Sequence, residues 1–106
     1  MQKSVTLLFA GALLFAGSNL YAQKGDAAKG KEVFDQCSVC HNADSTEVKM
    51  GPGLKGLFKR KMTSGKPAND ANVLQQINDG GNGMPAYKDI LSDTEKANVI
   101  AYLKTL

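Results

Sequence analysis

The run Cys37-Ser38-Val39-Cys40-His41 constrains this chain more than any other feature of its sequence. C-x-x-C-H is the attachment signature of c-type haem. Each thiol can form a thioether to one vinyl group, and the imidazole beside the second thiol can then coordinate the iron. Covalent bonds also retain a cofactor without a large apolar pocket. The run therefore predicts one haem c, bound through Cys37 and Cys40, with His41 as an iron ligand.

Two other uses of these cysteines compete with haem attachment. A redox C-x-x-C of the thioredoxin type needs a βαβ context, and the sequence has no strand-rich pattern. A tetrahedral zinc site needs four N or S ligands, whereas the chain has two Cys and one His. Both alternatives stay open, but the residues favour haem.

The N-terminal stretch has the layout of a secretory signal peptide. Lys3 supplies a positive charge, residues 5–16 form a weakly polar to apolar run, and Ala22 is a small residue at a plausible cleavage site. We therefore expect a signal peptide over 1–22 and a domain over 23–106 exported to the periplasm. An uncleaved membrane anchor is the alternative, although the run is much shorter than the roughly 20 residues that span a bilayer.

The charge balance argues against a nucleic-acid partner. The chain has 106 residues, enough for one domain, with 13 Lys and Arg against 10 Asp and Glu, for a formal net charge of +3. Two haem propionates would bring the net charge near zero, so local patches would decide which protein partners bind. One local concentration of basic residues is either an ordinary solvated surface or a docking patch: Lys55, Lys59, Arg60, Lys61 and Lys66.

Three segments carry helix signals, each with apolar residues at positions i, i+1 and i+4. We expect the first helix to run from Ala27 into Cys37, with Asp26 as its N-cap. The second helix should be capped by Asn69 or Asp70 and should end at Gly80 or Gly81. The third helix should run from the capping box Ser92-x-x-Glu95 to about Thr105. Long loops in so small a chain need something to pack against. The sequence therefore predicts an all-α fold with three main helices and long loops wrapped around one haem.

A second axial ligand must come from a residue other than His, because His41 is the only one. The thioether of Met is the common alternative. Met50 is close to His41 in the chain, and Met62 lies among charged residues. Met84 stands between a glycine-rich run and Pro85, which together allow close approach and stiffen the loop. We therefore expect Met84 to ligate the iron, with an open sixth position as the alternative.

The mature chain resembles class I (monohaem) cytochromes c, especially small bacterial periplasmic ones. The resemblance rests on four blocks in the same order: Gly30-Lys31-x-x-Phe34 before the C-x-x-C-H run; Pro52, Leu54, Gly56, Leu57, Phe58 and Arg60; Gly83-Met84-Pro85; and Ala101-Tyr102-Leu103. Together the blocks cover almost the whole segment after residue 22. The resemblance implies the cytochrome c fold.

The same resemblance implies roles for four further residues. The Pro52 carbonyl would accept a hydrogen bond from the His41 ring, a contact that orients the imidazole. Leu54 and Phe58 would pack beside the haem, and Arg60 would approach a propionate. The chain departs from the pattern because it has no Trp, and therefore no counterpart of the propionate-binding Trp.

The function that these features favour is one-electron transfer in the periplasm. The haem iron would cycle between Fe(II) and Fe(III) as a soluble, monomeric protein shuttles between redox partner proteins, with no enzymatic activity of its own. Two alternatives are open. One is a five-coordinate haem domain that binds a small gas or acts as a weak peroxidase. The other is the haem subunit of a larger redox enzyme.

Export and haem attachment predict a specific mass. Protein made in an export-competent host should begin near Gln23 and exceed the mass of that chain by one haem, and the haem should survive denaturation because thioethers hold it. Intact-mass spectrometry checks both points. A mass equal to the full 106 residues without haem would contradict the cofactor and the signal peptide together.

Overall fold

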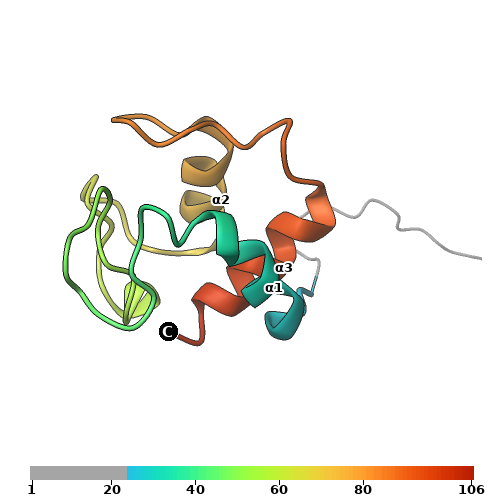
Figure 1. Ribbon diagram of the computed structural model, residues 1–106, viewed down its shortest axis with the longest axis horizontal. Helices are drawn as coiled ribbons and strands as arrows, with labels where there is room; N and C mark the ends of the chain where they lie inside the picture. Colours follow the sequence, from blue (N-terminus) through green and yellow to red (C-terminus); the bar gives the residue numbers. More distant parts are fainter. Residues whose placement is uncertain (1–23) are drawn as a thin grey trace, which may run out of the picture.

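The computed structural model describes residues 24–106; the predicted signal peptide over 1–22 therefore lies outside the described residues. Three α-helices and two short 3₁₀ helices make up the regular structure (Figure 1). Residues 24–106 contain two isolated β-bridges and no strand. No helix in this range is long and apolar enough to cross a membrane.

The elements in order are α1 (Ala27–Val33), η2 (Phe34–Gln36), η3 (Leu57–Lys59), α2 (Asp70–Asp79) and α3 (Asp93–Leu103).

The helices begin where the capping residues of the sequence predict. Asp26 accepts a hydrogen bond from the Lys29 N–H, and Asn69 accepts one from the Asn72 N–H. Ser92 and Glu95 form both bonds of a capping box at α3. The ends differ slightly from expectation, because the α1 segment tightens into the 3₁₀ helix η2 at Phe34 and α3 ends at Leu103.

Helices α1 and α3 cross at a distance that only glycine permits. A Cβ on Gly30 would lie 1.9 Å from the Asn98 carbonyl oxygen, and one on Gly25 would lie 2.0 Å from that of Ala97. The Asn98 side chain accepts a 2.8 Å hydrogen bond from the Asp26 N–H. Phe34 and Tyr102 pack beside the crossing with ring centroids 5.4 Å apart. The crossing explains the glycine inside α1 and fixes the direction in which the chain enters the C-x-x-C-H run.

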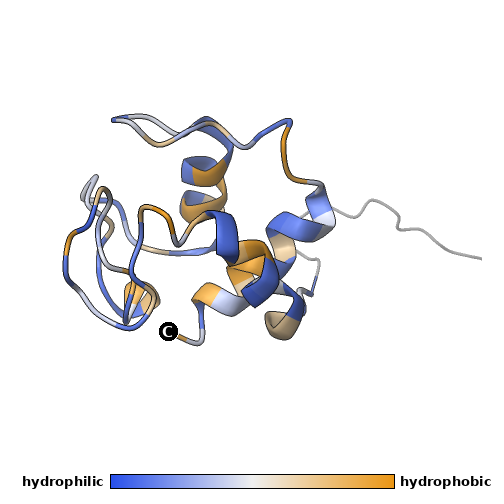
Figure 2. Cartoon of the chain, viewed as in Figure 1, coloured by the Kyte–Doolittle hydropathy of each residue, from blue (hydrophilic) through white to orange (hydrophobic). Residues whose placement is uncertain are grey.

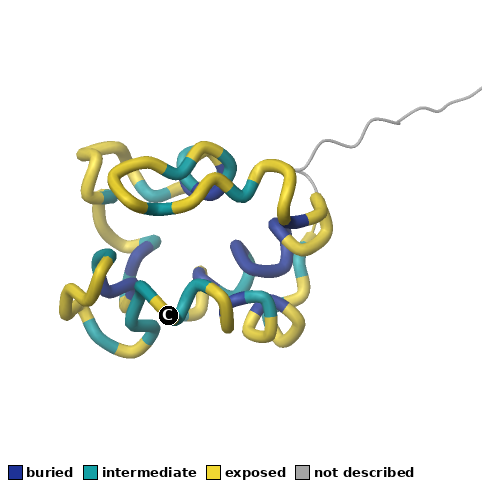
Figure 3. Tube along the Cα trace, turned by 45° about the horizontal axis from the view of Figure 1, so that its top comes forward, coloured by how far each residue is buried: buried dark blue, intermediate teal, exposed yellow. Residues whose placement is uncertain are grey.

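The buried residues come from all three helices and from the segment around η3. In Figure 2 the apolar parts of α2 and α3 lie toward the interior of the fold, and Figure 3 shows buried segments around its centre with exposed loops outside. The connecting loops therefore lie around the buried interior. The apolar core consists of Phe34, Leu54, Leu57, Val73, Leu74, Ile77, Leu91, Val99, Ile100 and Leu103.

The crossing yields a stability prediction. Gly30→Val should lower the melting temperature strongly, because overpacking a tight contact costs about 1–3 kcal/mol and each kcal/mol lowers the melting temperature by roughly 4–8 °C in a small domain. Ala28→Val, at an exposed position of the same helix, controls for the helix propensity of valine. Thermal unfolding followed by circular dichroism compares the two variants. Equal melting temperatures would show that the Gly30 contact contributes nothing to stability.

Candidate functional site

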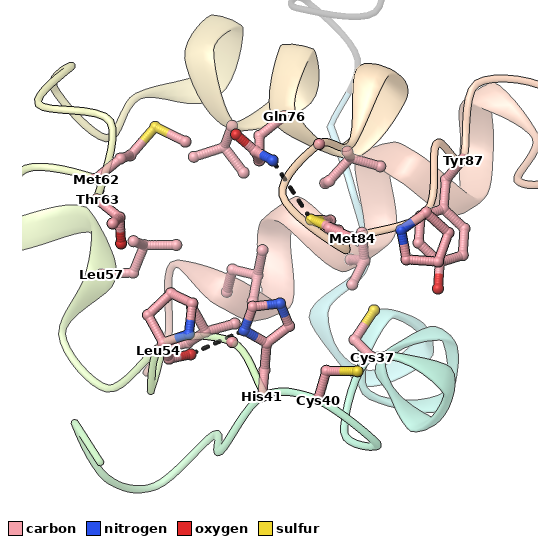
Figure 4. Close-up of a pocket in the computed structure, with 18 of the residues that line it drawn as sticks. Cys37, Cys40, His41, Leu54, Leu57, Met62, Thr63, Gln76, Met84 and Tyr87 are labelled. Atoms are coloured by element: carbon pink, nitrogen blue, oxygen red, sulfur yellow. Dashed lines mark hydrogen bonds between the residues drawn. The ribbon is translucent and has the colours of Figure 1, made fainter. Parts of the chain in front are cut away.

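The interior of the fold contains a partly open cavity of about 650 Å³. This volume lies within the roughly 300–1,000 Å³ of pockets that bury a cofactor-sized ligand. Most of its lining is apolar, and its helical part comes from α2, α3 and the two 3₁₀ helices (Figure 4). The residues that could bind a metal or form covalent bonds enter from three loops, which follow η2, η3 and α2. These cavity-lining residues are Cys37, Cys40, His41, Met50, Met62 and Met84.

His41 is held by contacts on two sides of its ring. Its Nδ1 lies 2.8 Å from the Pro52 carbonyl oxygen, the pair that the family resemblance implies. Because a carbonyl can only accept, Nδ1 carries the proton and Nε2 keeps its lone pair for the cavity. A Cβ on Gly51 would lie 2.5 Å from the ring Cε1, so the glycine backbone packs directly on the imidazole. The ring is therefore fixed in tautomer and orientation before any metal binds.

Cys37 and Cys40 lie beside His41 at the wall of the cavity (Figure 4). Burial, together with the smaller effect of the neighbouring Cys40, raises the pKa of the Cys37 thiol to about 11. Cysteines of thioredoxin-like motifs have a lowered pKa, because the thiolate is the reactive form. The environment of Cys37 thus disfavours the redox C-x-x-C alternative. Residues 24–106 also contain no group of three or more His, Cys, Asp or Glu that could hold a metal ion.

Met84 is presented by a tight turn at the other side of the cavity. Gly81 and Met84 exchange two backbone hydrogen bonds of 2.9 and 3.0 Å around Asn82 and Gly83. Both central residues have positive φ, 53° and 91°, as a type I′ turn requires and as Asn-Gly favours. Behind the turn, a Cβ on Gly80 would lie 2.3 Å from the Met84 carbonyl oxygen. The glycine-rich run therefore exists to bring the methionine backbone close to the end of α2.

Gln76 donates to the sulfur of Met84. Its Nε2 lies 3.5 Å from Met84 Sδ and 3.1 Å from the Gly80 carbonyl oxygen (Figure 4). One amide thus holds both the thioether and the end of α2. Sequence reasoning missed this residue. The signal that could have found it is a polar side chain between Val73 and Ile77, on the buried face of the helix.

The two other methionines are placed differently from Met84. Met62 is partly buried against the core and lines the cavity, although charged residues flank it in the sequence. Met50 is 80% exposed, and its Sδ lies 3.5 Å from Cys40 Sγ. Met50 therefore lies on the side of the cavity that carries the cysteines, while Figure 4 shows Met62 away from both His41 and Met84.

Leu54 and Arg60 line the cavity, but Phe58 does not. Phe58 belongs to η3, where three residues complete a turn, so that neighbouring side chains point in directions about 120° apart. Leu57 takes the inward direction and is buried. The Phe58 ring instead faces Lys104 Nζ, 5.8 Å from its centroid. Arg60 Nη2 donates to the Gly53 carbonyl oxygen at 2.5 Å, and the expected contact of Arg60 with a propionate stays a prediction.

The residues of the cavity fit the group that the C-x-x-C-H run predicts. An apolar space, two adjacent thiols, an imidazole with a free Nε2 and a thioether from the facing loop converge on it. Nitrogen and sulfur donors of this kind bind the iron of c-type haem. The donor set, rather than the volume alone, distinguishes this cavity from a general apolar pocket.

Comparison with known proteins gives one family and several curated relatives. Residues 27–106 match the family model described as Cytochrome c. Cytochrome c6 of Synechocystis sp. is 31% identical over 98 residues, which cover 92% of this chain and 78% of the relative. Cytochrome c2 of Blastochloris viridis is 34% identical over 112 residues, covering 89% and 88%.

Solved structures with the same fold include two cytochromes of similar size. Cytochrome c6 of the diatom Phaeodactylum tricornutum has a TM-score of 0.59 and 30% identity, covering 76% of this chain and 93% of the other. Cytochrome cH of Methylobacterium extorquens has a TM-score of 0.60 and 29% identity, covering 77% and 100%. The similarity thus extends over almost the full length of both cytochromes and over 76% and 77% of this chain.

The contact of Gly51 with the imidazole yields a prediction for the purified holoprotein. Gly51→Ala should displace the His41 ring, because the added Cβ cannot remain 2.5 Å from Cε1. We expect changed NMR signals of the His41 ring and a loss of stability of about 1–3 kcal/mol. Gly65→Ala is the control, since Gly65 has φ +90° and no atom within 4 Å, so alanine there adds only backbone strain. His41 signals that stay unchanged in Gly51→Ala would contradict the prediction.

Proposed function

The chain belongs to the cytochrome c family, and from this premise we propose that it is a periplasmic electron carrier with His41 and Met84 as the axial ligands of its iron. Members of this family hold haem c through thioethers to two cysteines, which here are Cys37 and Cys40. When bound, the haem supplies an Fe(II)/Fe(III) couple that exchanges one electron at a time with partner proteins.

The observation that carries the proposal is the convergence of one imidazole and one thioether on the cavity beside the two cysteines. His41 Nε2 is free because Nδ1 donates to the Pro52 carbonyl. Met84 Sδ has one hydrogen bond, a 3.5 Å contact from Gln76 of α2. Both donors are neutral, and neither has to lose a proton to bind metal. With both present, the iron has no position left for a substrate, which favours electron transfer over chemistry at the metal.

The residues around the cavity would set the reduction potential. A neutral thioether favours Fe(II) over the more highly charged Fe(III), and His/Met ligation therefore raises the potential. The apolar lining acts in the same direction, because a low dielectric disfavours extra charge. The amide of Gln76 competes for the sulfur lone pairs. These side chains, rather than any reaction of their own, are the contribution of the protein to the redox chemistry.

The remaining parts of the proposal follow from the same arrangement. The chain would act as a monomer without enzymatic activity of its own and without binding nucleic acid, because its charge is nearly balanced. The periplasm is the proposed location, since the predicted signal peptide and the attachment run both indicate export. Its partners would be redox proteins. A gas-binding or weakly peroxidatic haem domain is the alternative to test.

Met84→Ala tests the proposed ligand. The variant should lower the reduction potential, lose the weak long-wavelength band of Met–Fe(III) ligation that is typical of the family, and let added imidazole or CO bind. It should keep its haem, because Cys37 and Cys40 are unchanged. A redox titration with visible spectra measures all of these properties.

Met62→Ala is the matched control, since Met62 also presents a thioether to the cavity. It should leave the spectrum and the potential unchanged. The reverse pattern, with Met62→Ala altering both and Met84→Ala neither, would show that the ligand is wrongly assigned. No change in either variant would mean a five-coordinate or otherwise ligated iron, and would favour the ligand-binding alternative.

A further inference from the structure

Lys96 is a buried lysine on the apolar face of α3. Only 5% of its side chain is exposed, and lysine is almost never fully buried unless it is paired. An apolar residue would normally fill its position on the helix, because the residues at i+3, i+4 and i+7 are the buried Val99, Ile100 and Leu103. A charged side chain at this position needs a reason other than packing.

The partner of Lys96 is a backbone carbonyl in the loop that carries Met84. Lys96 Nζ donates a 2.8 Å hydrogen bond to the Lys88 carbonyl oxygen. The nearest carboxylate, that of Asp93, is 4.0 Å away and 81% exposed, too far for a hydrogen bond. We call residues 80–91 the methionine loop. Among the hydrogen bonds formed within residues 24–106, this one alone joins the methionine loop to α3.

All other hydrogen bonds that tie this loop to a helix go to α2. The Tyr87 N–H donates to the Ile77 carbonyl at 2.9 Å, and the Lys88 N–H donates to that of Asn78 at 3.2 Å. Gln76 supplies the side-chain contacts to Gly80 and Met84. Lys88 is therefore fixed at its N–H by α2 and at its carbonyl by α3. Pro85 limits the freedom of the short segment that connects Lys88 to Met84.

We propose that Lys96 is a positioning residue that keeps the methionine loop closed over the cavity by holding Lys88 against α3. The inference rests on the proposed function, in which Met84 is the axial ligand. Met84 Sδ itself is held only by the long contact with Gln76, so the loop depends on its anchors for the position of the sulfur. A hydrogen bond from a charged donor is stronger than one between neutral groups. This strength matters here because one hydrogen bond joins the methionine loop to α3.

The experiment compares three variants of the holoprotein. Lys96→Met removes the donor and keeps the apolar stem, Lys96→Arg keeps a charged donor, and Lys104→Met is the control. Lys104 lies at the end of the same helix and forms a 2.8 Å ion pair with Asp70, remote in sequence from the methionine loop. Three quantities are measured: the melting temperature, the rate at which imidazole binds Fe(III), and hydrogen exchange at the Tyr87 and Lys88 amides.

Lys96→Met should bind imidazole about tenfold faster and exchange both amides about tenfold faster, the effect of losing one hydrogen bond to a charged donor. Lys96→Arg should return both rates toward wild type. Lys104→Met should lower the melting temperature and change neither rate. This pattern would show that Lys96 acts on the closure of the methionine loop and not only on the stability of the whole fold.

Two results would overturn the inference. One is a Lys96→Met variant that loses stability while its imidazole and exchange rates stay at wild-type values, because Lys96 would then be structural only. The other is a Lys104→Met variant that accelerates both rates equally. Failure of the proposed function looks different: wild-type protein would lack the Met–Fe(III) band and bind imidazole without a delay. The amide exchange of Tyr87 and Lys88 would then decide the role of Lys96 by itself.

Discussion

The close crossing of α1 and α3 is the contact on which the rest of the structure depends. Gly30 within α1 and Gly25 just before it let the backbone of this segment contact α3. The chain can then leave α1 only in the direction that leads the cysteines to the wall of the cavity. The same crossing turns Val99 and Leu103 of α3 toward that cavity. Two glycines without side chains thus decide where the reactive side chains lie.

The two proposed axial residues are held by different kinds of contact. His41 has a short hydrogen bond to Pro52 and a glycine packed on its ring, so that its orientation is fixed locally. Met84 belongs to a turn whose own hydrogen bonds are good, but its sulfur has one 3.5 Å contact and its loop is anchored at a distance. The orientation of the His41 imidazole is therefore determined by its immediate neighbours. The position of the Met84 thioether depends on the whole segment between α2 and α3.

Much of this arrangement could be predicted from the sequence, because it depends on local chemistry. Capping residues fix the helix starts, the C-x-x-C-H run fixes the attachment site, and the glycines with Pro85 indicate the loop that brings Met84 to the cavity. Which side chain of η3 faces the cavity could not be predicted, because Leu57 and Phe58 are both apolar. Only the path of the chain in the fold decides which of the two is buried. Gln76 and Lys96 were missed for a related reason. Each is a polar residue whose partner lies in a loop that sequence spacing does not place.

The position of Gln76 and Lys96 has a common physical logic. Each interrupts the apolar face of its helix, which costs burial of a polar group unless a partner is supplied. The methionine loop supplies both partners, through Gly80 and Met84 for the amide and through Lys88 for the ammonium. An apolar residue at either position would add to the packing of the core but would give the loop no hydrogen bond to hold it. The two polar residues therefore exchange some core packing for a defined loop, and a defined loop is what a neutral sulfur ligand requires, because no charge of its own draws it to the metal.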